Sequence, residues 1–529
     1  MSAERLARHG IAASYTDTEG RRREPSPEAL AALLAEFDDA PGADPLPAPA
    51  PAPGRCQPLP PGRVWGPSVQ LYALRSARNW GMGDFGDLAA LIDWAAARGA
   101  ALVGLNPLHA LFAHEPAHCS PYSPSTRLAW NTLYLDVEAI PEYAECAAAR
   151  ALVGSAPFRA RLAQLREAPL VDYPGIAAAK HEVLRLLFAR FSDSPRVEQL
   201  ERWLSEDVRR HAAWEAQHAG GSAVYYEYLQ WQADLQLAGC AAHARAAGMA
   251  VGLYLDIAVS VDRAGSEVAV HPELFARRAS LGAPPDPFNE RGQDWGLPPP
   301  RPDLMRATGY AQFRRTLAAN MRHAGAVRID HVMQLARLYW VPAGFPATDG
   351  AYVQYPLEAL LAVLAEESRR HRCIVVGEDL GTVPPGIRGA MARAGIPGMR
   401  LLRFERSAQG AFLPADAYPA EALCALGTHD MPPLAGWLGD PAFAADRGAL
   451  GQALGAMPDA ENVYAFLAST PCRLMLLQPE DALGVAEPWN VPGTTIEHPN
   501  WRRKLPLAIE DFARSAPLER VVAAIRRHR

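Results

Sequence analysis

The sequence has no surplus of basic side chains and no long apolar run. Lys and Arg number 52 against 58 Asp and Glu, which gives a net charge of −6. The chain therefore lacks the electrostatic signature of a nucleic-acid-binding protein and has no attraction for an anionic membrane surface. No stretch approaches the roughly 18 consecutive apolar residues of a transmembrane helix, and the first residues contain no apolar signal-peptide core. We expect a cytoplasmic protein that binds neither nucleic acid nor a membrane.

Clustered cysteines are also missing. The seven cysteines are scattered, odd in number, and form no Cys-x-x-Cys pair. Cys373 and Cys424 lie inside apolar runs, where a thiol behaves as a small hydrophobic side chain. The pattern favours a reducing compartment without disulfides. No His and Cys cluster has the spacing of a zinc site, and no glycine-rich phosphate loop follows an apolar run. We expect neither a metal nor a cofactor.

The most informative feature that is present is a set of short apolar runs that each end in a carboxylate. The runs are 249–256 with Asp256, 325–332 with Asp330, 373–380 with Glu378 and Asp379, and 422–430 with Asp430. In a parallel (β/α)8 barrel, catalytic residues come from the C-terminal ends of several strands. The pattern is therefore typical of a barrel enzyme with a carboxylate-lined site.

One of these runs, 325–332, carries an arginine two residues before its acid. Because side chains alternate along a strand, Arg328 and Asp330 share one face and Ile329 takes the other. A fixed positive charge beside an aspartate keeps it ionised, as a carboxylate nucleophile requires. The alternative is a structural ion pair at a strand end, which is common in proteins. The acids of the other three runs favour the functional interpretation.

Strand and helix patterns alternate from about residue 65. The predicted strands are 68–74, 101–108, 250–256, 325–332, 373–380, 399–404, 422–428 and 473–478. Eight strands alternating with helices predict an α/β fold, a (β/α)8 TIM barrel. Two insertions interrupt the rhythm after strands 2 and 3. The first, about 138–222, has helical periodicity, and the second, about 262–304, resembles a loop.

The N-terminal part has a different composition. Residues 1–40 predict a small helical segment, in which Ser26-Pro27 marks a helix start. Residues 41–62 are rich in Pro and Ala and predict a stiff, extended linker. We expect a domain boundary there, few contacts across it, and a catalytic barrel over 63–529.

Several motifs together resemble a known family. Asp330 in Val-Arg-Ile-Asp-His, Glu378 in Gly-Glu-Asp-Leu-Gly and Asp430 in Gly-Thr-His-Asp occur in the order found in the amylomaltases, the 4-α-glucanotransferases of glycoside hydrolase family 77. Further motifs that resemble this family are Ser120-Pro-Tyr122, Gly282-Ala-Pro-Pro-Asp286, Gly292-Gln-x-Trp295-Gly296, Pro492-Gly-Thr494 and Asn500-Trp501. The resemblance covers roughly residues 66–510.

The sequence also departs from the family pattern. Met431 stands where the family usually has Asn, and Pro488-Trp489-Asn490 stands where Arg-Met-Asn is usual. Around Asp256 the usual Gly-Asp-x-Pro is replaced by Leu-Asp-Ile-Ala. These departures concern the surroundings of the site and leave Asp330, Glu378 and Asp430 untouched.

The resemblance implies retaining transglycosylation on α-1,4-glucans, with malto-oligosaccharides as substrates. It implies that Asp330 is the nucleophile, that Glu378 is the general acid and base, and that Asp430 binds hydroxyl groups of the distorted sugar. The substrate-binding residues that it implies are Arg328, His331, His429, Asp256, Tyr122, Asp286, Phe288 and Trp295. Asp379, Glu480 and Asp481 are interpreted as structural.

Alternatives remain for some of these residues and for the function. His429 could be a core histidine, and Tyr122, Phe288 and Trp295 could be ordinary core aromatics, although their Pro/Gly-rich loops favour stacking on glucose rings. An α-amylase-type hydrolase would use the same barrel with water as the acceptor. A non-catalytic glucan-binding protein would be favoured by the loss of one acid, and all three acids are present.

Overall fold

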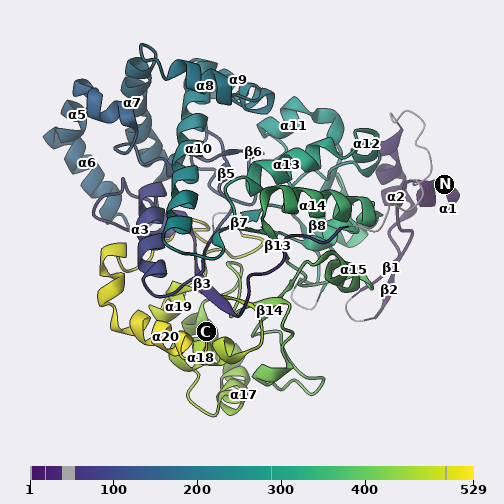
Figure 1. Ribbon diagram of the computed structural model, residues 1–529. Helices are drawn as coiled ribbons and strands as arrows, with labels where there is room; N and C mark the ends of the chain where they lie inside the picture. The colour runs from purple at the N-terminus through teal and green to yellow at the C-terminus, as the bar shows by residue number, and fades with distance from the viewer. Residues whose placement is uncertain (1–2, 18–19, 39–53, 287–288, 495–496) are drawn as a thin grey trace.

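The computed structural model describes residues 3–17, 20–38, 54–286, 289–494 and 497–529. Eight parallel strands form a closed barrel (Figure 1) in which the strands follow one another in chain order and the last pairs with the first. They are β3 (Val64–Val69), β4 (Leu102–Leu105), β7 (Gly252–Ile257), β10 (Ala326–Ile329), β13 (Ile374–Gly377), β14 (Gly398–Leu401), β15 (Ala422–Ala425) and β16 (Leu474–Leu477). The predicted (β/α)8 barrel is confirmed.

The first strand lies earlier in the chain than predicted. The run 68–74 is mostly apolar, but only its first two residues belong to β3. Leu71–Ala73 form a 3-10 turn, η2, instead. The Leu71 N–H donates to the Asn106 side chain at 2.7 Å, so its backbone donor is satisfied by a side chain and not by a neighbouring strand. A partner that is distant in sequence thus ends the strand, which local pattern could not predict.

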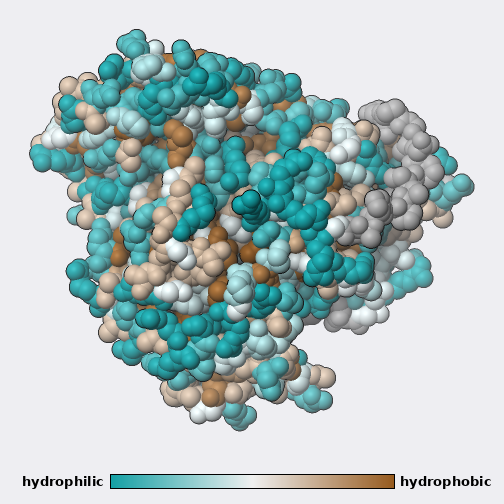
Figure 2. Space-filling model, viewed as in Figure 1, coloured by the Kyte–Doolittle hydropathy of each residue, from teal (hydrophilic) through white to brown (hydrophobic). Residues whose placement is uncertain are grey.

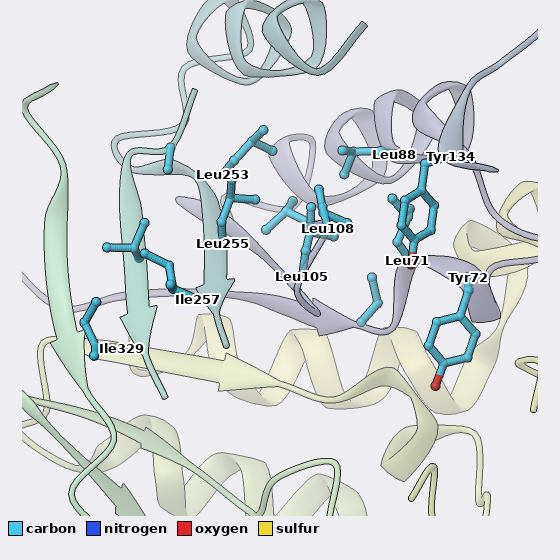
Figure 3. Packing of buried hydrophobic residues seen from close by; sticks show 14 of the residues in the cluster. Leu71, Tyr72, Leu88, Leu105, Leu108, Tyr134, Leu253, Leu255, Ile257 and Ile329 are labelled. Atoms are coloured by element: carbon cyan, nitrogen blue, oxygen red, sulfur yellow. The ribbon is translucent and has the colours of Figure 1, made fainter. Parts of the chain in front are cut away.

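The alternation of side chains along the barrel strands divides the core in two. Inward-facing residues such as Leu102, Tyr254 and Ala326 form a cluster inside the barrel. The residues that alternate with them along the strands, such as Leu255 and Ile329, face outward into the main core (Figure 3). The covering helices are α3 (Phe85–Ala96), α10 (Ala223–Ala246), α13 (Ala311–Met321), α14 (Leu357–His371), α15 (Ile387–Ala394), α18 (Ala460–Ser469) and α20 (Ala516–Arg526).

The predicted helical insertion after the second barrel strand is confirmed. It forms a helical lobe at the upper left of Figure 1. Its helices are α4 (Pro141–Glu145), α5 (Ala147–Gly154), α6 (Ala156–Glu167), α7 (Tyr173–Phe191), α8 (Val197–Trp203) and α9 (Glu206–Ala219). Local capping explains several starts: Ser155, Asp172 and Ser205 each accept a backbone N–H of the helix that follows.

The second insertion is more ordered than the loop-like interpretation suggested. It contributes β8 (Ala279–Ala283) and β9 (Gln293–Asp294) to a four-stranded antiparallel sheet of order β12-β11-β8-β9. The partner strands β11 (Arg337–Pro342) and β12 (Ala351–Gln354) follow β10 and were not predicted. These strands are short, and the two hairpins β8–β9 and β11–β12 are joined by the pairing of β8 with β11, whose residues lie far apart in the sequence. Local pattern could not predict that pairing.

The N-terminal segment packs on this antiparallel sheet. Ile11 forms a bridge with Val353, and the Phe37 ring stacks on Trp340 with centroids 5.8 Å apart. Ser26 caps α2 (Pro27–Leu34) as predicted. The described residues of the N-terminal segment thus pack against the rest of the chain (Figure 1, right), and the expectation of few contacts with the barrel part is wrong. Residues 41–53 of the predicted linker lie outside the described residues.

The remaining elements are short. They are α1 (Ala3–Arg8), β1 (Tyr15–Thr16), β2 (Arg22–Arg23), β5 (His109–Ala110), β6 (Thr126–Trp130), α11 (Ser266–Val270), α12 (Pro302–Ala307), α16 (Leu434–Gly439), α17 (Ala444–Leu454) and α19 (Pro479–Ala482). Among the described residues, no helix is both long and apolar enough to cross a membrane. Figure 2 shows a mostly hydrophilic face with one apolar patch near its centre.

The packing of Phe37 gives a first testable prediction. Its side chain is 4% exposed, so Phe37→Ala should destabilise the docking of the N-terminal segment by about 3–5 kcal/mol. Amide hydrogen exchange of α2, which reports local opening, should become faster by the corresponding factor. The control Phe404→Ala removes a ring that is 49% exposed and should leave this exchange unchanged. Unchanged exchange in Phe37→Ala would contradict the docking described here.

Candidate functional site

The centre of the site is the Arg328 guanidinium, which points into the barrel from β10. It donates to both oxygens of Asp256, on the neighbouring strand β7, at 2.9 and 2.8 Å. It lies 2.7 Å from Asp330 Oδ1 and 3.9 Å from Glu378 Oε2. Asp256, Arg328 and Glu378 are buried. One cation therefore holds three carboxylates that come from three adjacent strands.

The strand register explains why these residues meet. Arg328 lies directly opposite Asp256 in the β10–β7 pairing, and β13 flanks β10 on its other side. On β13, Ile374 and Val376 face the barrel interior, so Glu378 continues the inward-facing series just beyond the strand end. The expectation that Arg328 faces away from Ile329 is confirmed, since Ile329 belongs to the outer core.

Glu378 is held by two backbone donors. The His331 N–H donates to Oε2 at 2.8 Å and the Leu380 N–H donates to Oε1 at 2.7 Å. Burial and the nearby charge of Asp330 raise the pKa of Glu378 to about 7, although Arg328 and the two amides oppose this shift. The carboxyl can therefore both donate and accept a proton near neutral pH.

His331 occupies a strained turn between these groups. Its φ of 48° lies in the left-handed region, which non-glycine residues rarely adopt and which is often found at functional sites. Burial lowers the pKa of its imidazole to about 4, so the ring is neutral at neutral pH. The Trp295 ring meets it edge-on, with centroids 5.6 Å apart. The structure thus brings Trp295 to the edge of the carboxylate cluster.

The opposite wall of the site is formed by aromatic rings and a further acid, Asp430. The Tyr122 hydroxyl donates to Asp256 at 2.6 Å, and the Tyr122 ring stacks on His429 with centroids 4.4 Å apart. His429 Nε2 lies 3.4 Å from Asp430, and the Asn490 amide donates to the same carboxylate at 2.6 Å. The Asp430 side chain is 41% exposed, which leaves it accessible to a ligand.

His429 and Asp430 on this wall each favour the charged state of the other. Burial alone would lower the pKa of His429, but the adjacent Asp430 outweighs it and raises that pKa. Burial alone would raise the pKa of Asp430, but His429 and Asn490 outweigh it and lower that pKa. Burial, opposed by Arg328, raises the pKa of Asp256. The two aspartates thus differ in character, because Asp430 favours the ionised state and Asp256 depends on Arg328 for it.

The sequence segment after β8 carries two more of the substrate-binding residues that the resemblance implies, Asp286 and Phe288. The Asp286 carboxylate accepts the Asn289 N–H of its own loop at 2.7 Å. Phe288 lies outside the described residues. Asp379, interpreted as structural, is fully buried and accepts the Met399 N–H at 2.9 Å, with Arg388 beside it.

Sequence reasoning assigned no role to Trp501 and Asn490, although it quoted their motifs. The Trp501 ring lies 5.4 Å from that of Tyr122 and 5.3 Å from that of His429. A cavity at the barrel mouth is also lined by Tyr254 and Glu480. In the described part of the chain, no group of three or more His, Cys, Asp or Glu side chains is arranged to hold a metal ion.

Comparison with known proteins identifies the family. The family model of the 4-alpha-glucanotransferases, glycoside hydrolase family 77, matches residues 69–224 and 207–509. The chain belongs to this family. A 4-alpha-glucanotransferase of Haemophilus influenzae is 36% identical over 533 residues, covering 84% of this chain and 76% of its own. One from Mycobacterium tuberculosis is 36% identical over 553 residues, covering 87% and 75%.

Solved structures agree with this assignment. An amylomaltase from Corynebacterium glutamicum superposes with a TM-score of 0.88 at 26% identity, covering 99% of both chains. An amylomaltase from Streptococcus agalactiae, solved in complex with acarbose, shares the fold with a TM-score of 0.74 at 19% identity, covering 87% and 98%. The predicted 4-α-glucanotransferase activity is confirmed, and these comparisons give no support to the hydrolase alternative.

The contacts of the Arg328 guanidinium with both Asp256 and Asp330 lead to a prediction for Arg328→Lys, a substitution that keeps the charge. A lysine carries one ammonium group and cannot donate to both oxygens of Asp256 and to Asp330 in the same geometry. Arg328→Lys should therefore lower kcat/KM for a malto-oligosaccharide by about 100-fold or more, because two or more charge-assisted hydrogen bonds are lost. The measurement is steady-state kinetics of transfer.

The matched control is Arg337→Lys. The Arg337 guanidinium packs over the Tyr352 ring, 3.8 Å from its centroid, in the antiparallel sheet. This substitution should leave kcat/KM within about threefold, as is usual away from a site. Near wild-type activity in Arg328→Lys would show that the guanidinium geometry is not needed.

Proposed function

We propose that this glucanotransferase disproportionates malto-oligosaccharides by a retaining double displacement in which Asp330 is the nucleophile and Glu378 is the acid and base. The observation that supports this most strongly is that Asp330 and Glu378 share one guanidinium nitrogen but differ in environment. Asp330 lies 2.7 Å from that nitrogen and Glu378 lies 3.9 Å from it. Retaining glycosidases place their two carboxyl groups about 5–5.5 Å apart, and a common neighbour is compatible with that spacing.

In the first step, Asp330 attacks the anomeric carbon of a bound donor. The bond from that carbon to the glycosidic oxygen breaks as the bond to Asp330 forms, and Glu378 gives its proton to the departing oxygen. The ion pair with Arg328 supports an ionised nucleophile, and the raised pKa of Glu378 supports a protonated acid.

In the second step, the sugar is passed to an acceptor. Glu378, now ionised, takes the proton from an acceptor hydroxyl, whose oxygen bonds to the anomeric carbon as the bond to Asp330 breaks. Two inversions at the same carbon retain the α-configuration. Glu378 is thereby returned to its protonated state for the next cycle.

The aromatic wall would hold the donor ring. Asp430, fixed by His429 and Asn490, is exposed and can accept hydrogen bonds from sugar hydroxyls. Such bonds stabilise the distorted ring of the transition state. Tyr122 offers an aromatic face beside it, and the buried ring of Trp501 packs against Tyr122.

Other residues would contribute farther along the substrate. His331 and Trp295 lie at the acid's side of the cluster, where they would contact the donor sugar. Asp286 and Phe288 follow β8 in the sequence and would contact glucose units of the substrate. Asp256 is expected to act on the donor sugar mainly through Arg328 and Tyr122, since both of its oxygens are engaged by them.

The substrate proposal is tested by incubation with maltotriose alone. Transfer should produce a ladder of longer malto-oligosaccharides together with free glucose, because an acceptor sugar replaces water in the second step. The products can be resolved by anion-exchange chromatography. Glucose and maltose without any longer product would indicate hydrolysis and would contradict the proposal.

The roles of the two carboxylates are tested by Glu378→Gln with an activated donor. A glycosyl fluoride leaves without protonation, so the variant should still form the covalent intermediate and then stall, because the base for the acceptor is missing. Mass spectrometry should show one added glycosyl mass on Asp330. With maltotriose the same variant should lose several powers of ten in rate.

Two controls make this experiment decisive. Asp330→Asn should form no adduct with either donor, and Asp416→Asn, in the short helix at 415–417 outside the site, should behave as the wild type. An adduct on Glu378 or Asp430 would contradict the assignment of the nucleophile. An equal loss of rate with both donors would contradict the role of Glu378 as the acid.

A further inference from the structure

A buried tryptophan, Trp489, lies behind the wall of the site that Tyr122, His429 and Asp430 form. Trp489 is 2% exposed, and its indole N–H donates to Glu480 Oε1 at 2.7 Å. Glu480 is 4% exposed and lines the same cavity as Tyr122 and His429. Trp489 is one of the positions at which the chain departs from the family pattern described above, so the family assigns no function to this bond.

Two links lead from Trp489 into the site. The next residue, Asn490, donates its amide to Asp430 at 2.6 Å, and its backbone N–H donates to the His429 carbonyl at 3.3 Å. The Trp489 carbonyl accepts the Trp501 N–H at 3.0 Å. Trp501 has a left-handed backbone, φ 60°, and its ring contacts Tyr122 and His429. Trp489 is thus joined through Asn490 to Asp430 and through Trp501 to the rings of Tyr122 and His429.

The other end of the indole bond is firmly anchored. Glu480 follows β16 in the short helix α19 (Pro479–Ala482). Its neighbour Asp481 is buried and accepts the Leu434 N–H at 2.7 Å and the Tyr464 hydroxyl at 2.6 Å. The barrel wall and these two bonds fix the base of α19, so Glu480 offers a rigid acceptor to the Trp489 loop.

We propose that Glu480 and Trp489 are positioning residues for glucan transfer, which fix Asn490 and Trp501 and thereby set the sugar-binding geometry of Asp430. The inference rests on the proposed role of Asp430. Trp489 and Glu480 would act through Asn490 and Trp501 and not by contacting the sugar themselves. Their loss should therefore weaken the binding of the distorted sugar ring in the transition state and leave the affinity for the substrate nearly unchanged.

The protonation of Glu480 suggests a conservative variant. Burial, with Asp481 beside it, raises the pKa of Glu480 to about 8, so its carboxyl is neutral at pH 7. A glutamine has nearly the same shape and keeps an oxygen that can accept the indole N–H. Glu480→Leu removes the acceptor, and Trp489→Phe removes the donor while keeping an aromatic ring.

The experiment is a double-mutant cycle with maltotriose. Trp489→Phe and Glu480→Leu should each lower kcat by about 10- to 100-fold with KM changed by less than about threefold. The double variant should be no worse than the poorer single variant, because both remove the same bond. Glu480→Gln should stay within about threefold of the wild type. If Trp489→Phe does not fold, the difference between Glu480→Gln and Glu480→Leu decides instead.

Two further variants separate this inference from the function on which it rests. Trp437→Phe removes a buried indole N–H that donates to Asp446 at 3.1 Å, and it should leave kcat unchanged. Asp430→Asn should lower kcat at least as much as Trp489→Phe. Suppose that Asp430→Asn lowers kcat but Trp489→Phe has the same kcat as Trp437→Phe. The positioning role is then wrong, while the proposed function stands. The same conclusion follows if the losses in kcat of Trp489→Phe and Glu480→Leu add in the double variant. If Asp430→Asn is fully active, the proposed role of Asp430 is wrong as well.

Discussion

The site depends on the placement of one guanidinium inside a ring of carboxylates. Arg328 is buried, and it contacts Asp256, Asp330 and Glu378, so its positive charge offsets part of the cost of placing several carboxyl groups together in the barrel. The contacts are unequal, and this inequality has chemical consequences. The close ion pair stabilises the Asp330 carboxylate, whereas the longer contact leaves burial and the charge of Asp330 free to raise the pKa of Glu378. One cation thus allows two neighbouring carboxyl groups to differ in protonation.

The barrel supplies this arrangement by register. β10 lies between β7 and β13, so an inward-facing side chain on β10 has inward-facing neighbours on both sides. Arg328 and Asp256 pair directly, and Glu378 lies just beyond the strand end. Loops that follow other strands bring the sugar-binding groups: the Tyr122 loop follows β4, and the His429–Asp430 pair follows β15. The rigid sheet thus holds the reacting groups, while the loops form the walls that contact the sugar.

Much of this could be predicted from the sequence, because it depends on local pattern. The alternation at Arg328, Ile329 and Asp330 predicted which side chains share a face of the strand. The alternation of strand and helix patterns predicted the eight-stranded barrel, and the four apolar runs that end in acids predicted the edge at which the site lies. Features that depend on distant partners could not be predicted in this way. The antiparallel sheet requires residues 279–294 to meet 337–354, and Trp501 reaches Tyr122 across most of the chain. Likewise, a Pro-rich stretch indicates an extended chain but carries no information on whether Phe37 packs against Trp340.

The central claim is that burial and the charge of Asp330 raise the pKa of Glu378 to about 7, so that a large fraction of this carboxyl is protonated at neutral pH. It is tested most directly by a carbon-13 NMR titration of labelled glutamate carboxyl groups, in which the Glu378 signal is assigned by its absence in Glu378→Gln. The account predicts a midpoint near pH 7 in the wild-type protein. In Asp330→Asn the midpoint should move to lower pH, because the neighbouring negative charge that raises it is gone. A wild-type midpoint near the ordinary glutamate value of about 4.3, unchanged in Asp330→Asn, would contradict the account.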